Sequence, residues 1–374
     1  MAMRITGYLV LIFAALLAPV HATEVTDAIE IVRTASPTTA TSDEIRAAWK
    51  TLADAEVDEI PTMLRGMGSA NPAVENWLRT AVDAVFERAL ASKSELPKAA
   101  LVDLLADTQA APRGRRTAYE LLEQIDPPKA QELLVNMMED PSLEIRYDSV
   151  AANLELADAA EGEAKQQQLH RILGSARDLE QIEQCITSLE EFGEEIDLAA
   201  HLGYIKSWRL CGVFDNSSQG GFAVVYPPEQ TIDFAASYEG KEETAQWQSE
   251  SISTDDSMGK VDLNDLIGPE KGAAAYAYTE IEVAEMTPIQ VRYISPNATK
   301  LWVNGQLVAS NEVYHGGTAI DQYIVDVTLQ AGVNKLLIKV CQNEQTDAWA
   351  QVWEFQLRLT DQLGGAIDFT PIKQ

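Results

Sequence analysis

The spacing of apolar side chains changes near residue 206. Before it, apolar residues recur every three to four positions, as from Val74 to Ala89, which is typical of the buried face of an α-helix. Prolines separate such stretches, as at Asn71-Pro72, because a proline can begin a helix but cannot continue one. We therefore predict a helical domain over residues 23–205.

The predicted helices repeat as pairs. An arginine follows a proline by 18 residues in three successive places, which are Pro61 and Arg79, Pro97 and Arg115, and Pro128 and Arg146. This length is typical of α-solenoids, in which each helix pair buries its apolar face against the next pair. The turn Asp140-Pro141-Ser142, which leads into an apolar helix with Arg146, resembles HEAT repeats. We expect the arginines to be structural and to bind carbonyl groups at the turns.

In the second half, apolar and polar side chains alternate, which is typical of antiparallel strands with one buried face. Clear examples are residues 289–293, 323–329 and 353–359. Asn304-Gly305 predicts a tight β-hairpin, because both central residues of such a turn need positive φ. We predict an antiparallel β-sandwich, or jelly roll, over 206–363 and a tail over 364–374. The fold class is therefore a multidomain α+β protein, with an N-terminal HEAT-like α-solenoid followed by this sandwich.

Two stretches, Lys300–Gln306 and Asp326–Val340, resemble the galactose-binding-like jelly roll that forms the sugar-binding domain of family 2 glycoside hydrolases and many carbohydrate-binding modules. The chain is also similar to a family of secreted bacterial proteins that joins HEAT-like helices to this domain. The matching stretches are Trp208–Phe222, Tyr226–Glu229, Ala274–Tyr278 and Lys339–Gln345. The resemblance implies the architecture first, since such domains bind sugars in some proteins and only brace a neighbouring domain in others.

Aromatic side chains of the second half are the candidates for ligand binding. Sugars have apolar C–H faces that stack on flat rings, and hydroxyl groups that need fixed hydrogen-bond partners. Tyr314 and His315 fall in a glycine-flanked loop, and Trp302 and Trp349 are the main tryptophan candidates, with Trp247 as a further one. The alternative is that the tryptophans are core residues and that His315 only holds its loop.

The chain is strongly acidic, with 28 basic and 58 acidic residues and a net charge of −30. This sign repels nucleic acid and anionic lipid, so we expect neither as a partner. The acidic residues are spread along the chain, which favours a solvated surface over a cation site. Calcium at Asp255-Asp256, or at Asp262 and Asp265, is an unsupported alternative, because the spacing differs from an EF-hand loop. We expect no metal and no cofactor.

The N-terminal residues form a predicted signal peptide. Arg4 precedes an apolar run from Tyr8 to Ala18, and an A-x-A-like site predicts cleavage after Ala22. The run is too short to span a bilayer, and no later run approaches the length of a span. Since the first cysteine is Cys185, a lipid anchor is also excluded. We expect the mature protein to be exported, soluble, and periplasmic or extracellular, without membrane insertion.

Three cysteines are too few for a disulfide framework in a chain of this size. Cys185 falls on an apolar helical stripe and is expected to be a core residue. Cys211 and Cys341 both fall in predicted strands, and export would allow a disulfide between them. We keep this bridge as a hypothesis that a count of free thiols decides.

No residue pattern identifies a reaction, and we name no catalytic residue. The sequence contains no H-E-x-x-H, G-x-S-x-G or glycine-rich phosphate-binding motif. We therefore expect a secreted, non-catalytic protein that binds carbohydrate through the sandwich, with the helical repeats as scaffold; a pair of catalytic carboxylates stays open. The first alternative is a protein–protein interaction scaffold that binds an envelope protein. The second is an accessory protein of a polysaccharide-degrading system.

Overall fold

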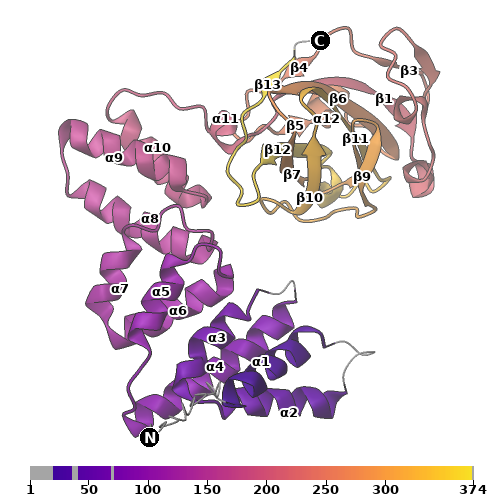
Figure 1. Ribbon diagram of the computed structural model, residues 1–374. Coiled ribbons are helices and arrows are strands. Elements are labelled where there is room, and N and C mark those ends of the chain that lie inside the picture. Colours follow the sequence, from indigo (N-terminus) through magenta and orange to yellow (C-terminus); the bar gives the residue numbers. More distant parts are fainter. Residues whose placement is uncertain (1–19, 36–40, 69–70, 373–374) are drawn as a thin grey trace, which may run out of the picture. The chain divides into compact units, whose positions relative to one another are not determined.

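The computed structural model describes residues 20–35, 41–68 and 71–372 (Figure 1). The chain divides into two compact units, Met1–Ser188 and Leu189–Gln374. The first unit is helical, and the second is built mainly from antiparallel sheets.

The predicted signal peptide lies mostly outside the described residues, which begin at Val20. Its predicted cleavage position, after Ala22, falls within the first described helix, α1 (Val20–Arg33). Within the described ranges, no helix combines the length and the apolar character that crossing a membrane requires.

The first unit consists of helices with short connections. Several begin with residues that satisfy the free N–H groups of a first helical turn. Thr41 forms a capping box with Glu44, and the side chains of Asn71 and Ser142 cap two longer helices. After α1, the helices are α2 (Ser42–Ala53), α3 (Ile60–Arg65), α4 (Pro72–Ser92), α5 (Lys98–Ala106), α6 (Pro112–Ile125), α7 (Pro127–Leu134), α8 (Leu143–Asp158), α9 (Gly162–Ser175) and α10 (Leu179–Glu190).

Neighbouring helices of the first unit pack side by side, with α1 on α2, α5 on α6, and α8 on α9 (Figure 1). The apolar stripes of α1 to α7, with Ile145 of α8, form one buried cluster that includes Leu52, Val82 and Leu122. The stripe predicted along α4 is confirmed, except that Trp77 at its edge stays exposed. Burial of such faces against one another is the main source of stability for short helices.

The arginines of the predicted repeats do not all have the same role. Arg115 donates from Nη1 to the carbonyls of Leu104 and Leu105, in the last turn of α5, at 3.2 and 2.7 Å. Arg146 donates from Nε to the carbonyl of Asp140 at 3.0 Å. Carbonyls of a last helical turn and of the turns between helices need such partners from outside the helix. The prediction that the repeated arginines bind carbonyls at turns is confirmed for Arg115 and Arg146.

For Arg79 that prediction is wrong, because this arginine pairs with carboxylates on neighbouring helical surfaces. Its Nη1 atom is 2.5 Å from Glu120 of α6, and its Nε atom is 2.9 Å from Asp83 of its own helix. Arg116 of α6 pairs in turn with Glu120 at 2.9 Å and with Asp148 of α8. A row of ion pairs therefore connects α4, α6 and α8.

The second unit contains a larger sheet of order β2-β3-β1-β6-β11-β8-β9, with β13 also on β6 and β4 on β1, and a smaller sheet of order β10-β7-β12-β5. The first strand begins at Ser207, where the sequence predicts that alternation begins. The strands are β1 (Ser207–Asp215), β2 (Ser237–Glu239), β3 (Thr244–Trp247), β4 (Ile252–Ser253), β5 (Val261–Asp262), β6 (Ala273–Val283), β7 (Thr287–Ile294), β8 (Ala298–Val303), β9 (Gln306–Asn311), β10 (Tyr323–Leu329), β11 (Gly332–Gln342), β12 (Glu354–Thr360) and β13 (Thr370–Pro371).

The hairpin predicted at Asn304-Gly305 is confirmed. These two residues join β8 to β9 with φ angles of 51° and 79°. Both angles are positive, as the tight turn requires. The Asn304 side chain also accepts a hydrogen bond from the Lys335 amide of β11 at 2.9 Å, so the turn is fixed to the neighbouring strand.

The two sheets share one buried cluster. Trp208 of β1 and Phe355 of β12 meet edge to face, with ring centroids 5.1 Å apart. Alternate residues of β11, Leu336, Ile338 and Val340, point into the same cluster. One face of each sheet is therefore excluded from water, which supplies the stability of this unit.

Residues just before β1 extend the smaller sheet. The Ile205 amide donates to the Leu357 carbonyl at 2.9 Å, and the Leu359 amide donates to the Gly203 carbonyl at 2.9 Å. These bonds lie along β12, beyond the two residues that pair with β5. The stretch that follows α11 (Leu198–Leu202) thus forms part of the second unit.

The other face of the larger sheet is covered by the segment that follows β1, residues 216–236. Lys339 of β11 has no exposed surface and binds this segment: its Nζ atom lies 2.8 Å from Glu229 and donates to the carbonyls of Gly221 and Val224 at 2.8 Å each. Burial lowers the pKa of Lys339, and the hydrogen bond to Glu229 opposes that shift.

All three cysteines are buried and free. Cys211 of β1 lies opposite Tyr276 of β6, and Cys341 of β11 lies opposite Ala274 of the same strand, so β6 runs between the two cysteines. Adjacent strands are about 4.8 Å apart, and two spacings exceed the roughly 7 Å that a disulfide allows between Cα atoms. The predicted bridge between Cys211 and Cys341 is therefore wrong. Cys185 is a core residue, as predicted.

Candidate functional site

The loops at one end of the larger sheet bring together three of the four candidate residues. Tyr314 and His315 lie in the loop between β9 and β10, and Trp349 lies in the loop between β11 and β12, within the short helix η4 (Ala348–Ala350). Both loops leave the sheet where β9 and β11 end. The fourth candidate, Trp302, lies within β8.

The rings of His315 and Trp349 meet edge to face, with centroids 4.7 Å apart and planes at 74°. Trp349 is 61% exposed. Large aromatic rings are usually buried, and a ring this exposed in a folded domain is a common feature of binding surfaces. The ring contact with His315 limits the orientations that the indole can adopt.

His315 is held by a hydrogen bond to Asn343. The Asn343 Nδ2 atom lies 2.7 Å from His315 Nε2, and the Asn343 Oδ1 atom accepts from the Gln345 amide at 3.1 Å. The second bond fixes the amide orientation, so nitrogen faces the imidazole. Nε2 of His315 is therefore the acceptor, and its proton sits on Nδ1, which can donate to a ligand.

Gln342 orders the loop that carries Trp349. This glutamine has no exposed surface, and it donates from Nε2 to the Val352 carbonyl at 2.9 Å. Its Oε1 atom accepts from the Asn343 amide at 3.0 Å and from the Asn297 side chain at 3.3 Å. Because every polar atom of its amide is bonded, Gln342 fixes both ends of the loop.

Tyr314 turns toward the interior. Its ring packs against the buried cluster on the outer face of the larger sheet, and its hydroxyl accepts a hydrogen bond from Asn216 Nδ2 at 3.1 Å. Burial raises the pKa of Tyr314 to about 12. Tyr314 therefore supports the loop from beneath, and His315 and Trp349 form its exposed part.

Trp302 is a core residue. It is 7% exposed and belongs to the same buried cluster as Tyr276 and Leu337, and Trp247 is buried there as well. The alternation of β8 places Trp302 on the outer face of the sheet, but the segment 216–236 covers that face. Neither ring offers an open face to a sugar.

Two of the acidic residues considered for calcium, Asp256 and Asp262, have local structural roles. Asp256 accepts hydrogen bonds from the Met258 and Lys260 amides at 2.9 and 3.2 Å, and Asp262 caps the short helix α12 (Leu263–Leu266). Over the described residues, no group of three or more His, Cys, Asp or Glu side chains is arranged to hold a metal ion.

The amide side chains of this site lie in stretches that carry the family resemblance, but the sequence named none of them as a site candidate. Asn216, Gln342, Asn343 and Gln345 have no motif spacing, and polar residues at the end of a strand are common. A signal was present in the run Gln342-Asn343-Glu344-Gln345, because consecutive amides directly after a buried strand need hydrogen-bond partners.

No model of a known protein family matches the sequence, and no curated protein matches it. Among solved structures, a β-glucosidase from Kluyveromyces marxianus is similar at 10% identity and a TM-score of 0.27, covering 77% of this chain and 36% of that one. The same enzyme in complex with glucose is similar at 11% identity and a TM-score of 0.28, covering 76% of this chain and 36% of that one. The chain thus spans little more than a third of these structures.

Proposed function

We propose that this chain is an exported, non-catalytic binding protein whose second unit is a galactose-binding-like jelly roll that binds carbohydrate. The binding surface is the loop cluster of Trp349, His315 and Asn343, with Tyr314 beneath it. The first unit is a HEAT-like solenoid that serves as scaffold. The observation that carries the proposal is the largely exposed indole of Trp349, held against His315.

The chemistry of the cluster suits a neutral sugar. An exposed indole offers an apolar surface for the C–H face of a pyranose ring. The free Nδ1–H of His315 and the side chain of Gln345 supply a donor and further polar groups beside it. Because Gln342 and Asn343 fix these loops, little conformational entropy is lost on binding.

The finer fold assignment is supported by two features. Side-by-side helix pairs, carbonyl-bonded arginines at two turns and a row of ion pairs across α4, α6 and α8 are typical of a stacked solenoid. Two antiparallel sheets that share one core are typical of a sandwich.

Calorimetric titration of the full chain with neutral polysaccharides and their oligomers tests the proposal. The W349A variant should bind at least tenfold more weakly than the wild type, whereas W77A, which removes an exposed tryptophan from α4, should bind normally. No heat of binding at millimolar ligand, which corresponds to about −4 kcal/mol, would overturn the proposal. Equal binding by W349A and the wild type would remove Trp349 from the site.

A second candidate function is a protein–protein interaction scaffold of the cell envelope. A cavity of about 490 Å³ on the first unit is lined by Arg116, Tyr147, Arg177 and Gln181, and Tyr147 is exposed beside it. Tyrosine and arginine are enriched at the centres of protein interfaces. Affinity capture from envelope extract with the wild type and Y147A tests it: a stoichiometric partner lost only in Y147A would favour this function.

A further inference from the structure

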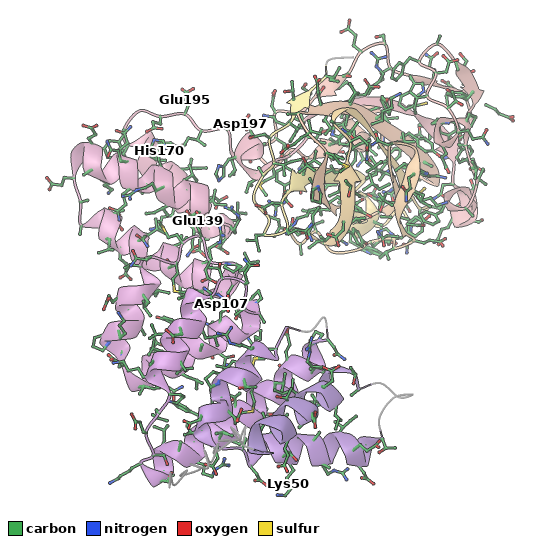
Figure 2. The ribbon with its side chains drawn as sticks, in the orientation of Figure 1. Lys50, Asp107, Glu139, His170, Glu195 and Asp197 are labelled. Carbon is green, nitrogen blue, oxygen red and sulfur yellow. The ribbon has the colours of Figure 1, made fainter. Side chains whose placement is uncertain are left out.

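A second concave site lies in the second unit, away from the Trp349 loops. A cavity of about 990 Å³ opens where the start of β1, the strand β4 and the C-terminal segment with β13 meet. Asp197, the N-cap of α11, is one of its lining residues. Figure 2 labels Asp197. No residue that lines this cavity belongs to the loop cluster of Trp349.

Arg209 is the unusual residue of this cavity. Its neighbours Trp208 and Leu210 point into the core between the sheets, so the strand alternation sends Arg209 to the other side. It is 8% exposed, and its guanidinium lies 4.1 Å from the ring centroid of Phe234. Its Nε atom is buried without a hydrogen-bond partner.

The other buried arginines all have partners, and Arg209 forms no ion pair with any described residue. Arg292 and Arg358 both bind Asp321, at 2.6 Å each, and Arg115 binds Asp140. The Nε atom of the Arg209 guanidinium has neither water nor a hydrogen-bond partner, which is costly for a charged group. An anion in the cavity would satisfy it, and a carboxylate matches the planar fork of arginine.

The remaining walls limit the charge of that anion. Lys206 pairs with Asp197 at 3.3 Å, so much of its positive charge is already offset. Glu250 and Asp368 also line the cavity and repel a polyanion. A ligand with a single negative charge is therefore favoured over a phosphate or a sulfated chain.

The uncharged walls suit a sugar ring. Four serines, Ser207, Ser249, Ser251 and Ser253, are among the lining residues and can offer hydroxyl groups. Ile367 and Phe369 line the cavity with apolar surface. A lining that combines hydroxyl groups with apolar surface matches the two kinds of surface on a pyranose.

We infer that this cavity binds an acidic sugar, a uronic acid whose carboxylate pairs with Arg209 and whose ring lies between the serine hydroxyls and Phe369. The inference does not require that Trp349 binds sugar, because the two sites share no residue. It adds a second, charge-selective site to the second unit.

Titration of the full chain with D-glucuronate tests the inference, with the neutral D-glucuronamide as matched ligand and acetate as a carboxylate without a ring. Glucuronate should bind, and glucuronamide and acetate should each bind at least tenfold more weakly. R209Q should lose glucuronate binding, whereas R46Q, which changes an exposed arginine of α2, should not. The comparison of glucuronate with glucuronamide and acetate uses the wild type, so it tests the binding of an acidic sugar even if R209Q does not fold.

No glucuronate binding up to 50 mM, roughly the weakest binding that titration detects, would overturn the inference. Binding of glucuronamide or of acetate as strong as that of glucuronate would also overturn it. So would undiminished glucuronate binding by a folded R209Q variant. The W349A variant separates this site from the proposed function. Loss of glucuronate binding in W349A with retention in R209Q would place the acidic sugar on the loops and reject the cavity. Loss of neutral-sugar binding alone in W349A leaves the cavity supported.

Discussion

Arg115 of α6 and Asp140, in the turn before α8, form an ion pair whose side chains are only 1% and 2% exposed. The pair lies at the turn that resembles HEAT repeats, and Arg115 also binds carbonyls at the end of α5. One guanidinium therefore joins α5, α6 and the turn before α8. Breaking this ion pair should therefore destabilise the first unit by more than the loss of a single contact would.

D140A should lower the free energy of unfolding of the first unit by about 3–5 kcal/mol, because Arg115 would keep a buried charge without a counterion. Urea unfolding followed by circular dichroism at 222 nm measures the change. D43A is the control, since Asp43 pairs with Arg46 at 2.7 Å on an exposed surface and should have little effect. Equal stability of the two variants would contradict the prediction.

Two tryptophans four positions apart should respond in opposite ways to truncation. W353A should lower the free energy of unfolding by about 3–5 kcal/mol, because Trp353 is fully buried in the core between the sheets. W349A should leave stability nearly unchanged, because its ring is mostly in water. Thermal unfolding of both variants checks this, and a large loss in W349A would mean that the ring is structural.

E229Q should destabilise the second unit by about 3–5 kcal/mol at neutral pH, because it leaves the Lys339 ammonium buried without a carboxylate. The loss should shrink as the pH rises from 7 to 10. Burial lowers the pKa of Lys339 from 10.5, so the unfolded chain binds more protons and stability rises with pH. The double variant E229Q/K339M should lack this pH dependence, and a flat profile for E229Q would be inconsistent with a buried ammonium.

Above pH 10 the wild type should lose stability. Burial raises the pKa of Tyr119, Tyr204 and Tyr314 to about 12, against 10.0 for an exposed tyrosine. Between these values the unfolded chain has lost phenolic protons that the folded chain keeps, so stability falls from pH 10 to pH 12. Phenolate absorbance, measured against pH with and without urea, follows the ionisation of the tyrosines in the unfolded and folded chain. The Y314F variant should lose less stability over this pH range. Identical titration curves with and without urea would refute the prediction.

Three thiols should react with a disulfide reagent once the unreduced protein is unfolded, and none should react quickly in the folded protein. Burial raises the pKa of Cys185 to about 11 and that of Cys211 and Cys341 to about 12, which suppresses the reactive thiolate. Ellman titration at pH 8 measures how many thiols react in the folded protein and how many react after unfolding. A count of one thiol after unfolding would mean that the bridge forms after all.

The sequence predicted local features well. The alternation of β-strands, the Asn304-Gly305 turn and the buried stripe of α4 each depend on neighbours within a few residues. The bond from Arg115 to helix-end carbonyls was also predicted, because free carbonyls follow from the helix end itself. Arg79 occupies the same place in its repeat, but it pairs with carboxylates of its own helix and of α6, and the repeat spacing does not reveal these partners.

Features that depend on strand order could not be predicted. Cys211 and Cys341 both fall in strands, but only the order β1-β6-β11 shows that a strand separates them. Trp302 has the alternation of an outward residue, yet the segment 216–236 covers it. Arg209 became a candidate only when the structure showed that its Nε atom is buried without a partner and that it forms no ion pair with any described residue, which a sequence with 58 acidic residues would not suggest.

The pairing of residues 203–205 with β12 decides where the second unit can be cut for expression by itself. A fragment that starts at Lys206 would leave backbone groups of Leu357 and Leu359 without their partners, on the edge of the smaller sheet. Bare edges of this kind recruit other chains and promote aggregation. Recombinant versions of this unit should therefore keep the residues from Leu189 onward.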